Sequence, residues 1–284
     1  MKYLNLFLAS LLVIFSSCGD DLDDNIVPVY ETPIDNSVVT NYFPEKANNY
    51  WTYKTENISS TATTIGRDSL YVGNDSIINA ITYKRMKTKA APTGFFCGAL
   101  RNNGLRIEGK LMKLTGDVSV NVGASLPVAF SVTDFVIFKE NATAGEEFGV
   151  TSGTITDATA IPGYPLTINY VLKAIEDGGL ATFTSNSVNY TDVKKIKLVL
   201  SVKVTTQVSS PFGPVVVNAL DPAFSDVDGF QSVVISDQYY AKNFGMVKSG
   251  TKVEYHLNPL LASATIPATA TQTINDYLLT KLIN

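Results

Sequence analysis

Apolar and polar residues alternate with a period of two in several stretches of this 284-residue chain. One such stretch carries apolar residues at Ile196, Leu198, Leu200, Val202 and Val204, with mostly lysine, serine and threonine between them. Leu126 to Val132 and Leu166 to Leu172 repeat the pattern. Because successive side chains of a strand point to opposite faces, this period predicts strands with one buried face.

Turn sequences separate these stretches. Asn102-Asn103-Gly104, Asp177-Gly178-Gly179 and the segment from Ser209 to Pro214 are typical of hairpin connections. Many half-buried strands joined by short turns predict an all-β fold with one large, curved antiparallel sheet. Curvature or closure protects the edges of such a sheet, so we expect an open half-barrel or a lipocalin-like barrel.

The C-terminal segment has a different pattern. Thr273 and Asp276 have the spacing of a helix capping box, and Ile274, Tyr277, Leu278 and Leu282 could form one face of a helix. We therefore expect a short C-terminal helix packed on the sheet.

The N-terminus has the plan of a secretory signal peptide. Met1 and Lys2 precede an apolar run from Leu4 to Phe15, and the small residues Ser16 and Ser17 follow it. Twelve residues of helix cover about 18 Å, which is too short for a hydrocarbon core of roughly 30 Å. A buried N-terminal helix is the alternative, but acidic residues follow the run directly. We interpret residues 1–17 as a signal peptide.

Phe15-Ser16-Ser17-Cys18 resembles the lipobox of bacterial lipoproteins. That resemblance implies that Cys18 is lipidated and becomes the mature N-terminus. The acidic run of Asp20, Asp21, Asp23 and Asp24 resembles the export signal of Bacteroidetes-type surface lipoproteins. It implies an outer-membrane protein that is anchored on the cell surface. More than one acyl chain is needed for stable anchoring, which fits this kind of modification.

Residues 18–40 read as an acidic tether with Pro28 and Pro33, and residues 41–284 read as a single β domain. The segments from Tyr42 to Lys54 and from Tyr239 to Ser249 resemble the opening and closing strands of uncharacterised bacterial surface and periplasmic lipoproteins. Many of those proteins have lipocalin-like or half-barrel folds. The resemblance implies a fold and not an activity.

Composition limits the partners. Removal of the 17-residue signal peptide takes away one lysine, leaving 21 basic and 26 acidic residues and a net charge of −5. No basic patch points to nucleic acid. Only Cys97 remains after acylation of Cys18, so no intramolecular disulfide can form. Cys97 follows two phenylalanines, and we interpret it as a small buried hydrophobe.

No sequence motif marks a catalytic or metal site. His256, the single histidine, is expected on the solvated face of a strand, and Asp226-Val227-Asp228-Gly229 is expected to be a turn. Neither a metal nor another cofactor is expected. A glycan hydrolase that assembles carboxylates from distant strands stays open as an alternative.

The favoured function is a non-catalytic binding module for a glycan, a lipid or a partner protein, and a structural or adhesin component is a further alternative. The candidate binding aromatics are Trp51, Tyr53, Tyr239 and Tyr240. Adjacent residues of a strand point to opposite faces, so one of each neighbouring aromatic pair is expected outside. Ser69 and Ser76 lie in Asp-Ser-apolar triplets that resemble O-glycosylation sites of Bacteroidetes-type exported proteins.

Overall fold

Thirteen antiparallel strands form one sheet in the part of the chain described by the computed structural model, residues 42–284 apart from 123–125, 162–163, 212, 260 and 263–266. The prediction of an all-β fold is confirmed. The strands are β1 (Tyr50–Ser59), β2 (Thr63–Ile78), β3 (Ile81–Lys87), β4 (Gly104–Glu108), β5 (Leu111–Val122), β6 (Leu126–Lys139), β7 (Glu147–Ile161), β8 (Tyr164–Ser185), β9 (Val188–Ser210), β10 (Gly213–Asn218), β11 (Gln231–Ala241), β12 (Gly245–His256) and β13 (Thr269–Leu282). The helices are α1 (Phe95–Leu100) and the 3₁₀ turn η1 (Pro222–Phe224).

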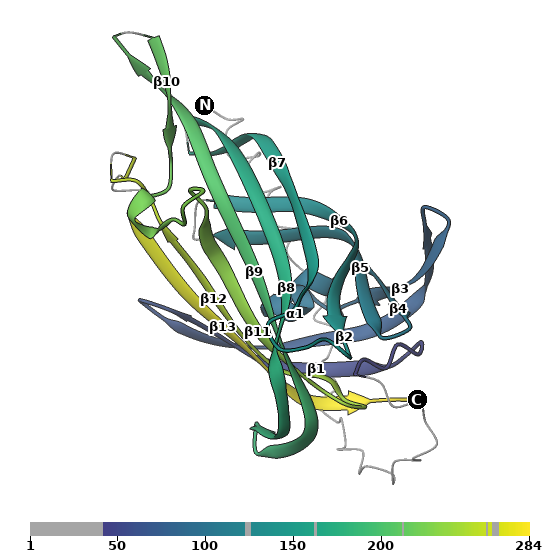
Figure 1. Cartoon of the computed structure of the whole chain (residues 1–284). Helices are drawn as coiled ribbons and strands as arrows, with labels where there is room; N and C mark the ends of the chain where they lie inside the picture. Colours follow the sequence, from purple (N-terminus) through teal and green to yellow (C-terminus); the bar gives the residue numbers. More distant parts are fainter. Residues whose placement is uncertain (1–41, 123–125, 162–163, 212, 260, 263–266) are drawn as a thin grey trace, which may run out of the picture. The chain divides into compact units, whose positions relative to one another are not determined.

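The first and last strands pair in the middle of the sheet (Figure 1). The order is β6-β5-β4-β3-β2-β1-β13-β12-β11-β9-β8-β7, and β10 pairs with β9 outside this path. Tyr50 lies opposite Leu282, and Ser59 lies opposite Gln272. The two ends of the described chain are thus held together by a long antiparallel strand pair.

The two edges of the sheet are consecutive in the chain. β6 and β7 are joined by residues 140–146, and no hydrogen-bonded register joins the two strands within the described residues. Their backbones nevertheless meet, since a Cβ atom added to Gly149 would lie 2.1 Å from the carbonyl oxygen of Val136. The rings of Phe130 on β6 and Tyr170 on β8 also stack across this junction, with ring centres 4.2 Å apart. The sheet is therefore a nearly closed, barrel-like structure.

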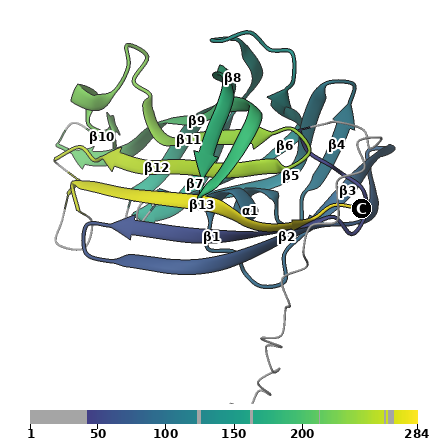
Figure 2. The ribbon, with the colours of Figure 1, turned by 90° about the horizontal axis from the view of Figure 1, so that it is seen from below.

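A short helix fills part of the interior. α1 packs against β2, β5 and β13, and Figure 2 shows the sheet curving around it. Phe96, Cys97 and Leu100 are buried, which confirms the prediction for Cys97. Within the described part of the chain, no helix is long and apolar enough to cross a membrane.

The predicted C-terminal helix is wrong, because the segment forms β13. Asp276 and Leu278 point inward and are 0% and 4% exposed, whereas Tyr277 points outward. Two apolar residues four positions apart, such as Ile274 and Leu278, fit a strand as well as a helix. The buried carboxylate between them interrupts the apolar face and hides the period of two.

The predicted turns have mixed outcomes. The segment from Ser209 to Pro214 joins β9 to β10 as a hairpin. Asp177-Gly178-Gly179 instead lies within β8, where the register with β9 shifts and Gly178 has a φ of +102°. Asn102-Asn103-Gly104 connects α1 to β4. The tip of the β8–β9 hairpin is Asn186-Ser187, and both residues have positive φ, as a two-residue type I′ turn requires.

Candidate functional site

The residues that carry the anchoring prediction lie outside the described part of the chain. Cys18 and the aspartates at positions 20, 21, 23 and 24 belong to this group. Lipidation and export therefore stay predictions.

Three of the four candidate aromatics are interior residues. Trp51, Tyr53 and Tyr240 are all 0% exposed, so none of them presents a surface to a ligand. Their polar atoms are satisfied internally. Trp51 donates to the carbonyl of Phe244 (2.7 Å), Tyr53 to the carbonyl of Met246 (3.1 Å), and Tyr240 to the Gln238 side chain (2.7 Å). All three residues belong to the hydrophobic core.

Tyr239 lies on the outer face and is half-buried, opposite to its neighbour Tyr240. It belongs to a row of alternating lysines and tyrosines that crosses five adjacent strands. The register places Lys54 on β1 opposite Tyr277, Tyr277 opposite Lys248, Lys248 opposite Tyr239, and Tyr239 opposite Lys195 on β9. We call Lys54, Tyr277, Lys248, Tyr239 and Lys195 the lysine–tyrosine ladder. Directly opposed residues of antiparallel strands point to the same face, so all five side chains are neighbours on one surface.

Each ammonium group of the ladder lies near a tyrosine ring. The Nζ atom of Lys248 lies 5.6 Å from the ring centre of Tyr277 and 6.0 Å from that of Tyr239. Lys54 lies 6.0 Å from the Tyr277 ring, and Lys195 lies 5.8 Å from the Tyr239 ring. These distances are close to the outer limit of cation–π attraction, which contributes about 0.5–1 kcal/mol at an exposed site and favours these positions of the lysine side chains.

Carboxylates neutralise the two outer lysines of the ladder. Lys54 pairs with Glu56 at 2.7 Å, and this contact raises the pKa of Lys54. Lys195 lies 2.6 Å from Asp177 and 3.5 Å from Asp237. Burial lowers the pKa of Lys195, but these carboxylates outweigh it and the pKa is raised. The central lysine, Lys248, has no carboxylate within 4.0 Å among the described residues.

The tip of the β8–β9 hairpin borders the ladder on one side. Phe183 of this hairpin stacks on Tyr239, with ring centres 4.3 Å apart and planes 6° apart. Further along the tip, Ser185 donates to the carbonyl of Val247 on β12, and Asn186 donates to the carbonyl of Leu278 on β13, each at 3.5 Å. The tip therefore crosses β11, β12 and β13 in turn, beside the ladder, and Figure 2 shows this crossing.

Two buried carboxylates meet inside the sheet at the start of α1. Asp68 on β2 accepts hydrogen bonds from the backbone of Thr93 (2.9 Å) and Gly94 (2.7 Å) and from the Thr93 hydroxyl (3.1 Å). Asp276 on β13 accepts from the Ser249 hydroxyl (2.6 Å) and from the backbone of Phe96 (3.3 Å). Together they fix the loop and the first turn of α1 against the sheet.

The electrostatics of this interior site favour neutral groups. Burial is the main cause that raises the pKa of Asp276 to about 6, and the charge of Asp68 adds to it. Burial also raises the pKa of the Cys97 thiol well above its usual value, with further contributions from both aspartates. A thiol in this environment stays protonated and is a poor nucleophile. The arrangement can position α1, but it presents no accessible reactive group.

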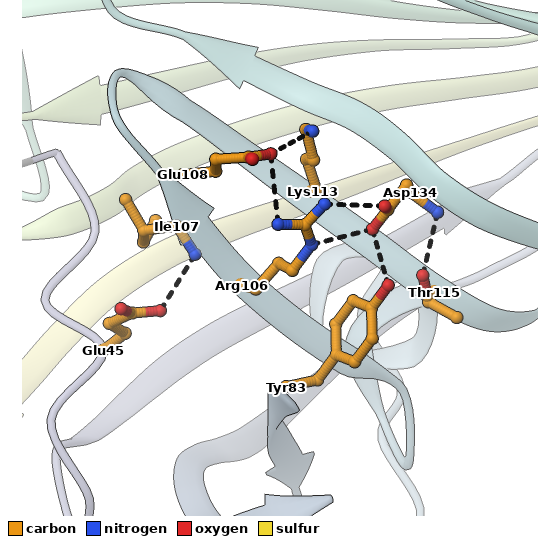
Figure 3. Close-up of polar contacts among 8 residues, drawn as sticks. All are labelled: Glu45, Tyr83, Arg106, Ile107, Glu108, Lys113, Thr115 and Asp134. Atoms are coloured by element: carbon orange, nitrogen blue, oxygen red, sulfur yellow. Dashed lines mark hydrogen bonds and ion pairs between the residues drawn. The ribbon is translucent and has the colours of Figure 1, made fainter. Parts of the chain in front are cut away.

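A second polar cluster joins β3, β4, β5 and β6 (Figure 3). Asp134, which has a φ of +49°, accepts from Arg106 through both carboxylate oxygens (2.9 and 2.7 Å) and from the Tyr83 hydroxyl (2.6 Å). Its backbone N–H donates to Thr115. The hydrogen bond from Arg106 is the main cause that lowers the pKa of Asp134 to about 2.

Glu108 completes this cluster. It lies 3.1 Å from Arg106 and also pairs with Lys113. Glu45 accepts separately from the backbone of Ile107 at 3.1 Å. Because the charged groups of the cluster are paired with one another, we interpret it as a clamp across four strands.

The remaining sequence candidates lie in the sheet or in turns. Ser69 and Ser76 are half-buried residues of β2, and Ser69 accepts from the backbone of Lys89 at 3.0 Å. His256 ends β12 and stacks on Phe224 with ring centres 3.7 Å apart. Asp226 accepts from the backbone of Asp228 and Phe230, as in a turn. Among the described residues no group of three or more histidine, cysteine or acidic side chains could hold a metal ion.

Sequence reasoning found Tyr239 but missed the rest of the lysine–tyrosine ladder. Its members come from segments up to 223 positions apart, between Lys54 and Tyr277. The missing information is the pairing of β1 with β13 and of β9 with β11, which no local pattern supplies.

No protein-family model, curated protein or solved structure matches this chain.

Proposed function

We propose that this chain is a lipid-anchored protein of the bacterial outer surface whose β domain binds an extended glycan without cleaving it. The lysine–tyrosine ladder is the observation that carries the proposal. It offers partly exposed aromatic rings, hydroxyl groups and ammonium groups on the outer face of five adjacent strands. Aromatic rings with polar tips suit ligands that have both apolar and hydroxyl-bearing surfaces, as sugar rings do.

The proposal includes anchoring at Cys18 and export directed by the acidic run that follows it. Labelling cells with a clickable fatty acid should mark the wild type and leave Cys18→Ala unlabelled. External protease should remove the domain from whole cells, and replacing the four aspartates with alanine should protect it. A label retained by Cys18→Ala would overturn the anchoring, and equal protease resistance in both strains would overturn the surface location.

The absence of catalysis is part of the same proposal. The buried carboxylates Asp68 and Asp276 are occupied in holding α1. The partly exposed carboxylates beside the ladder, Asp177 and Asp237, both pair with Lys195. Purified domain incubated with a polysaccharide panel should retain chains without releasing reducing ends. Release of sugar would favour the hydrolase instead.

The binding surface is tested by the double variant Tyr239→Ala/Tyr277→Ala. Affinity electrophoresis through gels that contain polysaccharide should show retardation of the wild type and its loss in the variant. Tyr71→Ala is the matched control, since Tyr71 is a half-buried tyrosine on the adjacent strand β2. Circular dichroism and an unfolding midpoint check that each variant is folded. Equal retardation of the folded double variant would refute the ladder as the binding surface, and binding only to vesicles or to a protein would refute the glycan.

A further inference from the structure

The charges around the ladder do not balance. Its three lysines are accompanied on the same face by Arg67, opposite Lys54, and by Lys197, which lies 3.2 Å from Asp177. The carboxylates beside them are Glu56, Asp177 and Asp237. Five cationic groups therefore face three anionic ones, on a protein whose overall charge is −4. The excess is centred on Lys248, which lies between two tyrosine rings instead of next to a carboxylate.

The spacing of the cations is regular. Lys54, Lys248 and Lys195 lie on alternate strands, so successive lysines are about 10 Å apart, given strands about 4.8 Å apart. This distance is about the length of two sugar units in an extended chain. A polymer that carries one carboxylate per disaccharide would place its charges at the same interval.

The surface beside the ladder favours a ligand that lies across the strands. Gly250 occupies the next outward position after Lys248 on β12, between Asn275 and Asp237 on the flanking strands. The nearest atom to a Cβ added there would be the Asn275 amide oxygen, at 3.5 Å. The row of outward residues next to the ladder, Asn275, Gly250 and Asp237, therefore has no side chain at its centre. The tip of the β8–β9 hairpin borders the opposite side of the ladder. A chain laid along the ladder would contact both tyrosines and all three lysines.

We infer that the glycan bound by the ladder is an acidic polysaccharide and that one of its uronate carboxylates pairs with Lys248. This inference rests on the proposed function and adds the chemical class of the ligand. The negative net charge of the whole protein opposes a nucleic acid, because double-stranded DNA carries one charge per roughly 1.7 Å of its length. A polymer with few negative charges can bind the local excess of positive charge and is repelled less by the negative net charge of the protein.

The first test compares each acidic polymer with its own uncharged ester. The probes are hyaluronate, alginate and polygalacturonate, and the methyl ester of each, in affinity gels with the mature full-length protein. We expect the acid form of at least one probe to bind, hyaluronate most tightly, and esterification to abolish that retardation. Binding should weaken with added NaCl, since exposed charges are screened.

The second test isolates Lys248. Lys248→Gln should weaken binding of the acid form about tenfold, as expected for loss of a hydrogen bond to a charged group, and Lys248→Arg should restore it. Lys252→Gln is the matched control. Lys252 occupies the same face of β12 four residues further on, but it pairs with Glu254. Its variant should bind like the wild type.

The outcomes separate the inference from the proposed function. Equal binding of a polymer and its ester, or of neutral glycans alone, would overturn the acidic ligand and leave glycan binding intact. Unchanged binding in a folded Lys248→Gln variant would also overturn it. Binding to DNA or to anionic lipid vesicles in preference to all the polysaccharides would overturn both.

Discussion

The buried carboxylate of Asp276 should cost the fold stability at neutral pH. Its pKa is about 6 in the folded protein and near 3.8 in an unfolded chain. The folded state therefore holds the proton more tightly, and stability falls as the pH rises from about 4 to about 6. The two pKa values correspond to about 3 kcal/mol of lost stability above pH 6, and this loss disappears below about pH 4.

The substitution Asp276→Asn removes this titration while keeping the shape of the side chain. The asparagine oxygen can accept from Ser249 and Phe96, as one carboxylate oxygen does now. The other carboxylate oxygen is buried and has no hydrogen bond of good geometry, although the nearby backbone N–H of Phe95 helps to lower the pKa. Its replacement by an amide group therefore loses at most this weak contact. We expect the stability advantage of the variant over the wild type to be about 3 kcal/mol larger at pH 7.5 than at pH 4.

Urea denaturation followed by circular dichroism across this pH range measures the difference. Burial also raises the pKa values of Glu176 and Glu45. Both residues are present in the variant and in the wild type, so their contributions to the pH dependence cancel in the difference between the two proteins. Asp68→Asn is the control. Because the Asp68 carboxylate accepts from both Thr93 and Gly94, we expect its loss to destabilise the protein and not to reproduce the advantage at neutral pH. A constant difference between Asp276→Asn and wild type from pH 4 to pH 7.5 would refute the reasoning.

Two other regions of the fold can be tested in the same way. Tyr83→Phe removes the hydroxyl that donates to Asp134 and should cost about 2 kcal/mol in urea denaturation; a cost near zero would show that Arg106 holds the carboxylate alone. Gly149→Ala places a Cβ against a backbone carbonyl of β6 and should cost about 3 kcal/mol. Gly98→Ala, in α1 with no atom within 4 Å of the added Cβ, should be neutral or stabilising, and equal melting temperatures for the two alanine variants would contradict the close contact of β6 and β7.

The strands could be predicted from sequence wherever one face is uniformly apolar. In β9, Ile196, Leu200, Val202 and Val204 are buried as predicted, and Leu198 is half-buried against the same core. Prediction failed for β13, where a carboxylate takes an inward position that a sheet normally gives to an apolar residue. It also failed at Asp177-Gly178-Gly179, because the same glycine that permits a turn permits a bulge in a continuous strand.

The helix α1 could not be predicted for a related reason. Its six residues are too few to show a helical period, and its position depends on Asp68 and Asp276, which come from strands far from it in sequence. Tyr239 could be assigned to the surface because its neighbour Tyr240 must face the other way. The ladder as a whole required the register of five strands.

The interior site and the outer ladder lie on opposite faces of the same strands. Asp276 and Tyr277 are adjacent on β13, as are Ser249 and Lys248 on β12. The hydrogen bond from Ser249 to Asp276 therefore ties β12 to β13 directly beneath the point where Lys248 meets Tyr277. Side chains that are already fixed by their neighbours lose little conformational entropy on binding. The buried carboxylate of Asp276 lowers stability at neutral pH, but it also supports the strand pair that carries the centre of the proposed binding surface.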